Sequence, residues 1–223
     1  SEKAFIIMTL SGIVVYATAL WVRRVENKGT QKMLLIAAVS LNVGVLFFLK
    51  YITRGSIILP LGISFYTLAL IGYLMDVYRE KIMPETNFFD FYLFETFFPH
   101  ILQGPIARYD TLAKQFKEKH TFDYDRFCRG LQLMLWGFIK KMVIADRAAI
   151  VVNNIYDTYY TVGGTELFFA SILYTLTIFA DFSGCVDIAR GTALIFGIRL
   201  SDNFRQPYLA VSVNDFWKRW HIS

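Results

Sequence analysis

Three ionisable side chains interrupt one otherwise apolar stretch, FADFSGCVDIARG at residues 179–191: Asp181, Asp187 and Arg190. Charged groups inside a membrane segment are costly and are therefore candidates for function. On a helix, Ser183 lies on the same face as Asp187, and Arg190 is close enough to Asp187 to pair with it. Two interpretations stay open: a buried ion pair that fixes helix packing, or a polar lining for a water-filled cavity or substrate tunnel.

A second candidate stretch is VNDFWKRWHIS at residues 213–223. A spacing of four on a helix places Trp217 beside His221 and Phe216 beside Trp220. The pattern predicts an amphipathic, aromatic-rich helix at a membrane interface. His221 is either an interfacial histidine with a satisfied hydrogen bond or, if partial desolvation holds it neutral, a group able to act on a hydroxyl as a general base.

The remaining histidines and cysteines carry weaker signals. His120 and Asp125 form an HxxxxD pattern, which some glycerolipid acyltransferases use, but they lie in a solvated run of charges and predict no site. His100 lies in an aromatic segment, where a structural role is expected. Cys128 and Cys185 have no metal-ligand spacing, so we expect reduced thiols, no metal and no bound cofactor. The sequence has no Walker loop, GxSxG, HExxH or dinucleotide motif.

Long apolar blocks must hold these side chains in place. Of 223 residues, 55% are apolar and 18% are charged, with a mean hydropathy of +0.42, whereas soluble domains carry about 25% charge. Three segments contain no charged residue: 4–22, 33–49 and 55–75. Each is close to the length that crosses a bilayer as a helix. The sequence therefore predicts a multi-pass membrane protein, and its net charge of +5 is attributed to topology rather than to nucleic acid.

Basic residues between the blocks predict an orientation. The turn RRVENKGTQK, residues 23–32, holds four basic residues and one acidic residue and is expected in the cytoplasm. The third block would then bring Arg79 and Lys81 back to the same side, while Lys50 and Arg54 at the outer turn oppose the trend.

The rest of the chain is less regular. Residues 88–103 are apolar and aromatic but broken by acids and a proline, which predicts a re-entrant or interfacial segment. Residues 108–126 are predicted to be a cytoplasmic loop, 131–139 a helix with one end at an interface, and 167–180 the start of another span. The expected fold is all-α: a multi-pass transmembrane helical bundle with re-entrant or interfacial helices and five to seven embedded segments.

Five stretches, in order and over nearly the whole chain, resemble the membrane-bound O-acyltransferase family, and most nearly its bacterial alginate O-acetyltransferase branch. They are PLGISFYTLALIGYLMDVYR (60–79), FFPHILQGPIARY (97–109), FADFSGCVDIARG (179–191), RLSDNFRQPYLA (199–210) and DFWKRWHIS (215–223). Where Cys185 stands, the family usually has an aromatic residue.

The resemblance implies a helical bundle around a tunnel, with an acyl donor entering from the cytoplasm and a hydroxyl acceptor arriving on the other side. His221 matches the first of two catalytic positions, while the second, in a Trp-His-Gly motif, would follow Ser223. Residues 1–223 are accordingly expected to be part of a single transmembrane acyltransferase domain that is inactive alone. The resemblance further implies that the tunnel is lined by Asp181, Ser183, Asp187, Arg190, Trp217 and Trp220. It also implies that the turn before the last helix is set by Asn203, Pro207 and Tyr208.

The implied activity is transfer of an acetyl group from acetyl-CoA, a cytoplasmic thioester, to hydroxyl groups of an exported, alginate-like polysaccharide. The second histidine would be the general base, and His221 would orient the acceptor or stabilise developing charge. Expected partners are membrane lipids, the polysaccharide and an extracytoplasmic acetyltransferase protein, in a bacterial cytoplasmic membrane. The alternatives are D-alanyl transfer to teichoic acids within the same family, a non-enzymatic transporter or flippase, and a purely structural membrane subunit.

Overall fold

The computed structural model describes residues 2–52, 62–101 and 103–222. Within these ranges the regular structure is helical and contains no strand beyond one isolated bridge, Phe204 to Trp220. The all-α prediction is therefore confirmed.

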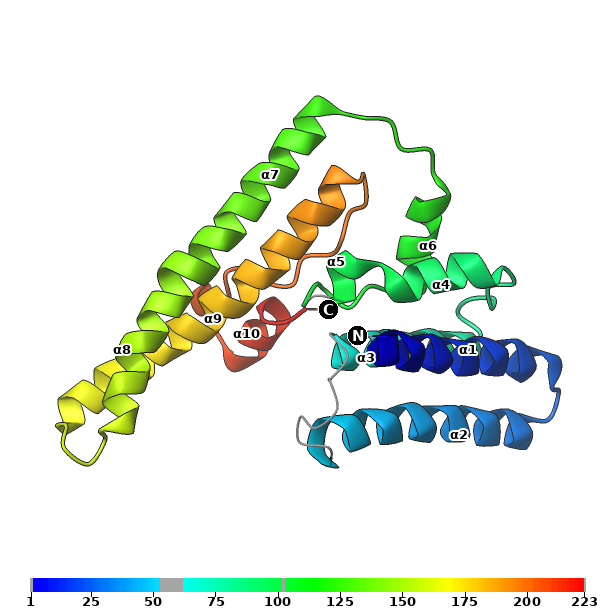
Figure 1. Cartoon of the computed structure of the whole chain (residues 1–223), viewed down its shortest axis with the longest axis horizontal. Coiled ribbons are helices and arrows are strands. Elements are labelled where there is room, and N and C mark those ends of the chain that lie inside the picture. The colour runs from blue at the N-terminus through cyan, green and yellow to red at the C-terminus, as the bar shows by residue number, and fades with distance from the viewer. Residues whose placement is uncertain (1, 53–61, 102, 223) are drawn as a thin grey trace. The chain divides into compact units, whose positions relative to one another are not determined.

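The chain divides into two compact units, which are described separately. Unit 1 comprises Ser1–Leu102 and Ile106–Lys119, and unit 2 comprises Gln103–Pro105 and His120–Ser223. The helices of each unit are labelled in Figure 1.

Unit 1 begins with three apolar helices and continues with three short ones. They are α1 (Glu2–Arg24), α2 (Lys28–Phe47) with the π-helix η1 (Phe48–Ile52), α3 (Ile63–Tyr78), α4 (Phe88–Thr96), α5 (Phe98–Ile101) and α6 (Tyr109–Lys117). By length and composition, α1 and α2 with η1 can cross a membrane, and α3 is a shorter apolar helix. The first two predicted spans are confirmed as helices. Of the third predicted span, 55–75, residues 55–61 lie outside the described residues, and the described helix runs from Ile63 to Tyr78, past the predicted end.

The basic turn between α1 and α2 lies at the same end of unit 1 as the end of α3. Glu80, just after α3, accepts a hydrogen bond from Lys28 at 2.9 Å and lies 3.6 Å from Arg23. Asn27 caps α2 by accepting from the Gly29 N–H at 2.8 Å. The two basic segments expected on one side of the membrane are thus together at one end of the unit.

The segment predicted to be re-entrant or interfacial is broken into α4 and α5. Glu95 on α4 is buried against α1, where a Cβ added to Gly12 would lie 1.8 Å from the Glu95 Oε2. His100 on α5 is 1% exposed, and its Nε2 lies 2.8 Å from the Phe94 carbonyl oxygen. This bond supports the structural role expected for His100.

The structure corrects the prediction that residues 108–126 form a loop, because α6 lies inside this segment. Its buried residues Tyr109, Leu112 and Ala113 follow the i, i+3, i+4 spacing of an amphipathic helix. The high density of charge around them hid this short apolar stripe.

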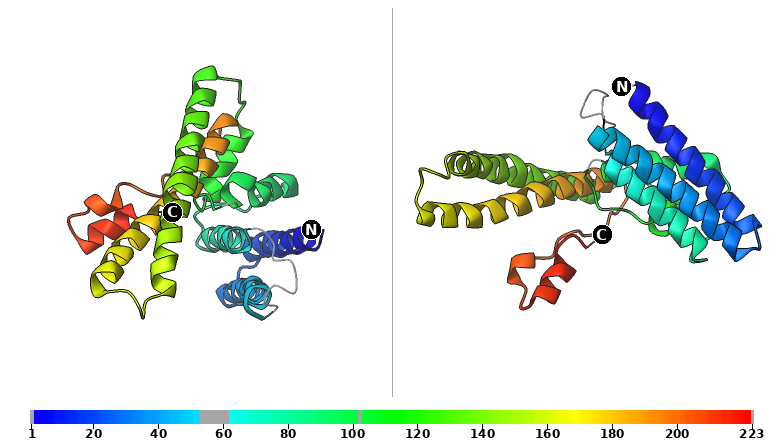
Figure 2. Two further views of the ribbon diagram at one scale, coloured as in Figure 1. Left: turned by 60° about the vertical axis from the view of Figure 1, so that its left-hand side comes forward. Right: turned by 90° about the horizontal axis from the view of Figure 1, so that it is seen from below.

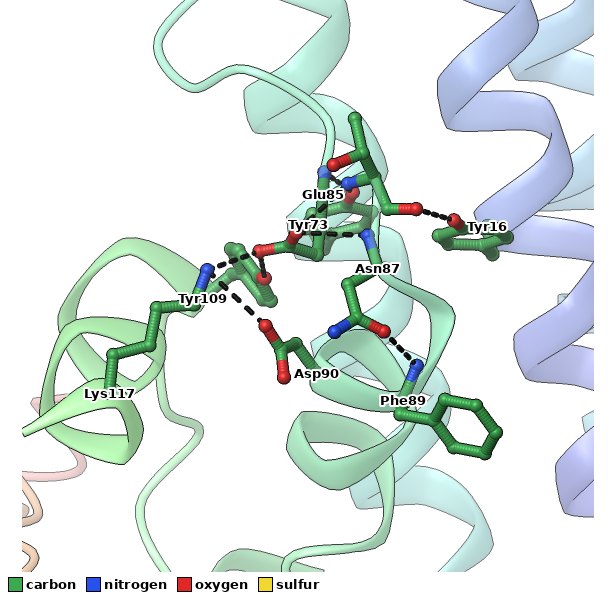
Figure 3. Close-up of polar contacts among 9 residues, drawn as sticks. Tyr16, Tyr73, Glu85, Asn87, Phe89, Asp90, Tyr109 and Lys117 are labelled. Carbon is green, nitrogen blue, oxygen red and sulfur yellow. Dashed lines mark hydrogen bonds and ion pairs between the residues drawn. The ribbon is translucent and has the colours of Figure 1, made fainter.

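Glu85 in the α3–α4 turn holds α6 in place (Figure 3). Its carboxylate accepts from Tyr109 Oη at 2.7 Å, from Lys117 Nζ at 2.9 Å and from the Asn87 N–H at 3.0 Å. Its own N–H donates to Tyr73 Oη on α3 at 2.9 Å. Burial alone would raise the pKa of Glu85, but these hydrogen bonds outweigh it and lower the pKa to about 2.

Replacing this carboxylate should loosen α6. We expect Glu85→Gln to cost roughly 2 kcal/mol in local stability, because bonds to a charged acceptor are lost, and to speed hydrogen exchange over residues 109–117. The lowered pKa means that the carboxylate contributes fully above the usual value of 4.5 and loses its contribution as pH falls toward 2. The difference between variant and wild type should therefore shrink on acidification. The exposed Glu118 provides a matched Glu→Gln control, and equal exchange in both variants would contradict the role of Glu85.

Unit 2 consists of two long antiparallel helical runs followed by a short terminal segment. The elements are α7 (Tyr124–Phe138), the π-helix η2 (Ile139–Ala145), α8 (Asp146–Asp157), α9 (Gly164–Ile195), the 3₁₀ turn η3 (Pro207–Leu209) and α10 (Val213–Arg219). The first three form one continuous helix, since the residues that join them keep right-handed helical backbone angles. α9 is long and apolar enough to cross a membrane, which confirms the span predicted to start near residue 167.

The helix predicted at 131–139 is much longer in the structure. It starts at Tyr124, where the Asp123 side chain caps it by accepting from the Arg126 N–H at 2.9 Å. It also continues past Lys140 and Lys141, the two charged residues that directly follow the predicted range. Both lysines have acidic partners on α9, so their charges do not terminate the helix.

Backbones of α7 and α9 come into direct contact at two glycine pairs, and the two helices run side by side (Figure 2). A Cβ on Gly137 would lie 2.6 Å from the Gly184 carbonyl oxygen, and one on Gly191 would lie 2.6 Å from the Gly130 carbonyl oxygen. The pairs are seven residues apart on each helix. Small residues at this spacing allow the close packing common between membrane helices.

A methyl group at this contact should separate the helices. Alanine normally stabilises a helix relative to glycine by up to about 1 kcal/mol, but we expect Gly137→Ala to destabilise the protein by about 1–3 kcal/mol through overpacking. Gly72→Ala is the control, because a Cβ at Gly72 meets nothing within 4 Å. Thermal unfolding in detergent measures both variants, and a Gly137→Ala protein as stable as wild type would contradict the described contact.

Candidate active site

Two acidic residues of α9, Asp181 and Asp187, lie well inside the helix, while Glu166 lies in its first turn. The helix has 32 residues, which at 1.5 Å per residue make it about 48 Å long. Ser183 is 3% exposed, and the side chain of Asp187 is 13% exposed. Polar groups are therefore held in the middle of a helix that is otherwise suited to lipid.

Two lysines that the sequence analysis did not single out pair with these acids. Lys140 forms an ion pair with Asp187 and donates to Ser183 Oγ at 3.2 Å. Lys141 pairs with Asp181. Both lysines belong to η2. The sequence signal for these ion pairs was the presence of two basic residues in one apolar segment and two acidic residues in another.

The predicted contact between Asp187 and Arg190 is present, at 3.5 Å. Together with the Lys140 pair, it supports the interpretation of Asp187 as part of a buried ion pair that joins two helices. A role of Asp181, Ser183, Asp187 and Arg190 in lining a tunnel stays a prediction.

After α9 the chain turns back and lies against the middle of that helix. The ring of Phe179 is 5.6 Å from that of Phe204 and 6.0 Å from that of Trp220, between centroids. Tyr208 Oη donates to the Thr175 carbonyl oxygen at 2.8 Å. The terminal segment is thereby held at the depth of the central turns of α9 rather than at its end.

The three predicted turn residues occupy the start of this returning segment. Asn203 is 1% exposed, and its carbonyl oxygen accepts from the Ile222 N–H at 3.0 Å. Pro207 is buried and begins η3, and Tyr208 makes the bond to α9 described above. Their positions agree with a role in presenting the last helix, which stays a prediction.

The structure corrects the expected position of His221 on the last helix. α10 ends at Arg219, and His221 has a left-handed backbone with φ of +51°. Its side chain therefore leaves the face that carries Trp217, which is 63% exposed. The other expected pair is confirmed, because Phe216 stacks on Trp220 with centroids 5.5 Å apart.

Backbone pairing takes His221 out of the helix. The Arg205 N–H donates to the Arg219 carbonyl oxygen at 2.9 Å, and the Ile222 N–H donates to Asn203 on the same partner segment. His221 lies between these two bonds, with its ring centroid 5.0 Å from that of Phe182 on α9. His221 is exposed, so its imidazole is accessible beside the ring of Phe182, at the middle of the candidate membrane span α9.

The other histidine motif remains without support as a site. His120 lies against Gly197 at the end of α9, while Asp125 is exposed in the first turn of α7. Among the described residues, no group of three or more histidine, cysteine or acidic side chains could hold a metal ion.

With this geometry established, the family can be stated. The model of the membrane-bound O-acyltransferase family matches residues 79–223, which contain α9, the returning segment and His221. The chain belongs to this family.

Curated relatives agree with the match. A probable alginate O-acetylase AlgI of Pseudomonas fluorescens is 37% identical over 202 residues, covering 89% of this chain and 40% of that protein. A peptidoglycan O-acetyltransferase of Helicobacter pylori is 32% identical, covering 93% of this chain and 47% of that protein. A teichoic acid D-alanyltransferase of Bacillus subtilis is 29% identical, covering 73% and 42% respectively. The chain thus spans less than half the length of these relatives.

Proposed function

We propose that this chain is part of a membrane O-acetyltransferase that moves an acetyl group from a cytoplasmic thioester, acetyl-CoA, to hydroxyl groups of an exported polysaccharide. The observation that carries the proposal is the exposed imidazole of His221, held by backbone pairing against the middle of a candidate span in a chain of this family. Names of similar proteins, alginate O-acetylase and peptidoglycan O-acetyltransferase, support a carbohydrate acceptor.

In the proposed reaction a carbohydrate oxygen attacks the thioester carbonyl carbon. The hydroxyl proton passes to a base, the C–S bond breaks, and the sulfur leaves as a thiolate to which the base returns the proton. His221 orients the attacking hydroxyl or stabilises the charge that develops on the oxygen. The base would be the second histidine implied by the family resemblance beyond Ser223, so turnover requires the longer protein.

The setting is a bacterial cytoplasmic membrane, with the basic turns of unit 1 in the cytoplasm. Lipids surround the apolar helices, and an extracytoplasmic acetyltransferase protein would act together with this one on the polymer. D-alanyl transfer is the second candidate, supported by the similarity to a teichoic acid D-alanyltransferase at lower identity.

The role of His221 is tested by substitution in the full-length gene. We expect His221→Ala to reduce polymer acetylation by about 10²-fold or more, as for removal of a positioned acid–base or charge-stabilising group. His120→Ala is the matched control, and it should acetylate at the wild-type rate because His120 lies away from the proposed chemistry. Wild-type acetylation by the His221→Ala protein would exclude His221 from the reaction.

The donor separates the proposed activity from its alternatives. Reconstituted full-length protein should transfer radiolabel from acetyl-CoA to polysaccharide and should ignore D-alanine bound to a carrier protein. Labelling from the carrier instead would establish the D-alanyl alternative. Movement of polysaccharide without consumption of any acyl donor would establish a transporter.

A further inference from the structure

A row of four charged side chains in unit 2 alternates in sign: Lys140, Asp187, Arg190 and Asp202. Lys140 and Asp187 have side chains only 12% and 13% exposed. Arg190 contacts Asp187 at 3.5 Å and forms a second ion pair with Asp202. The charges of these four residues cancel, and each inner member lies between two partners of opposite sign. At the far end Asp202 also lies 3.6 Å from a fifth, exposed charge, Arg205.

The far end of the row is connected to His221 through the backbone. Asp202 directly precedes Asn203, whose carbonyl oxygen accepts the N–H of Ile222, the neighbour of His221. The guanidinium of Arg190 therefore fixes the start of the segment against which His221 is paired.

The other end of the row, Lys140, contacts the turn of α9 that carries Phe182, the aromatic residue beside His221. Lys140 Nζ donates to Ser183 Oγ at 3.2 Å, and Ser183 follows Phe182, whose ring contacts His221. Lys140 thus contacts two parts of the structure around His221. One is the turn of α9 that carries Phe182 and Ser183, and the other is the series of ion pairs that ends at Asp202.

We propose that Lys140 is a positioning residue for His221, acting through Asp187, Arg190 and Asp202. The proposal rests on the proposed function, because it assumes that the placement of His221 limits acyl transfer. Lys140 itself belongs to η2, and its partners among the described residues are Asp187 and Ser183 rather than His221.

The physical reason is the sharing of charge along the row. Without Lys140, the buried carboxylate of Asp187 keeps only the guanidinium of Arg190, which it shares with Asp202, while Asp202 also has the exposed Arg205 as a partner. A buried carboxylate left without its cation is strongly unfavourable, so Arg190 shifts toward Asp187 and its hold on Asp202 weakens. Displacement of His221 by about 1 Å would cost up to about 10²-fold in rate without removing any substrate contact.

The test uses the full-length protein with acetyl-CoA and the polysaccharide that it acetylates. We expect Lys140→Met to lower kcat by about 10- to 100-fold, with KM for either substrate within about twofold of wild type. Lys140→Arg keeps the positive charge and should recover kcat to within about threefold. Lys141→Met is the matched control, since it removes the adjacent lysine of the same π-helix, whose partners Asp181 and Asp146 lie outside the row.

Three results would overturn the proposal: wild-type kcat in Lys140→Met, no recovery in Lys140→Arg, or an equal fall in Lys141→Met. If Lys140→Met does not fold, the double variant Lys140→Met/Asp187→Asn removes both charges and keeps the Arg190–Asp202 pair. It should fold and keep kcat near that of wild type, because no unpaired carboxylate at position 187 then draws Arg190 away from Asp202. A kcat as low as that expected for Lys140→Met, or a second failure to fold, would reject positioning by Lys140 through the row.

The His221→Ala variant separates this proposal from the proposed function. An active His221→Ala protein contradicts the role of the histidine itself. An inactive His221→Ala protein together with a fully active Lys140→Met protein contradicts only the positioning by Lys140.

Discussion

Direct backbone contact between α7 and α9 decides which side chains of unit 2 can meet. The glycine pairs Gly130–Gly191 and Gly137–Gly184 remove the side chains that would otherwise keep the helices apart. At this separation the lysines that follow Gly137 reach the acids of α9 directly. An apolar environment makes such ion pairs necessary, because an unpaired charge between the helices would be far more costly than the pair.

Periodicity and apolar block length were sufficient to predict the all-α architecture, the long apolar helices α1, α2 and α9, and a broken segment where α4 and α5 lie. They failed where local charge outweighed the pattern, as in α6, whose apolar stripe is only three residues wide, and at Lys140 and Lys141, where the helix continues past the predicted end at residue 139. The α9 partners of these lysines, Asp187 and Asp181, are 47 and 40 residues away in the chain, so a pattern of neighbouring residues cannot reveal them. His221 shows the opposite failure, since helical spacing ran past the true helix end. Its placement depends on backbone pairing with residues 203–205, which no side-chain pattern reports.

The region that matches the membrane-bound O-acyltransferase family includes all the helices of unit 2. The matched region begins at residue 79 and contains the whole returning segment. That segment brings His221 back from the end of α9 to its middle, where the exposed histidine lies beside the ring of Phe182. The ion pairs of Lys140, Asp187, Arg190 and Asp202 join η2, α9 and the start of the returning segment.

The π-helix η2 sets the rotational phase of everything that follows it. An α-helix advances about 100° per residue, and each wide π-turn takes up one extra residue relative to that repeat. If Ile139–Ala145 kept its length but formed a regular α-helix, α8 would be rotated by about one residue step relative to α7. The π-turn therefore decides which face of α8 is turned toward α9.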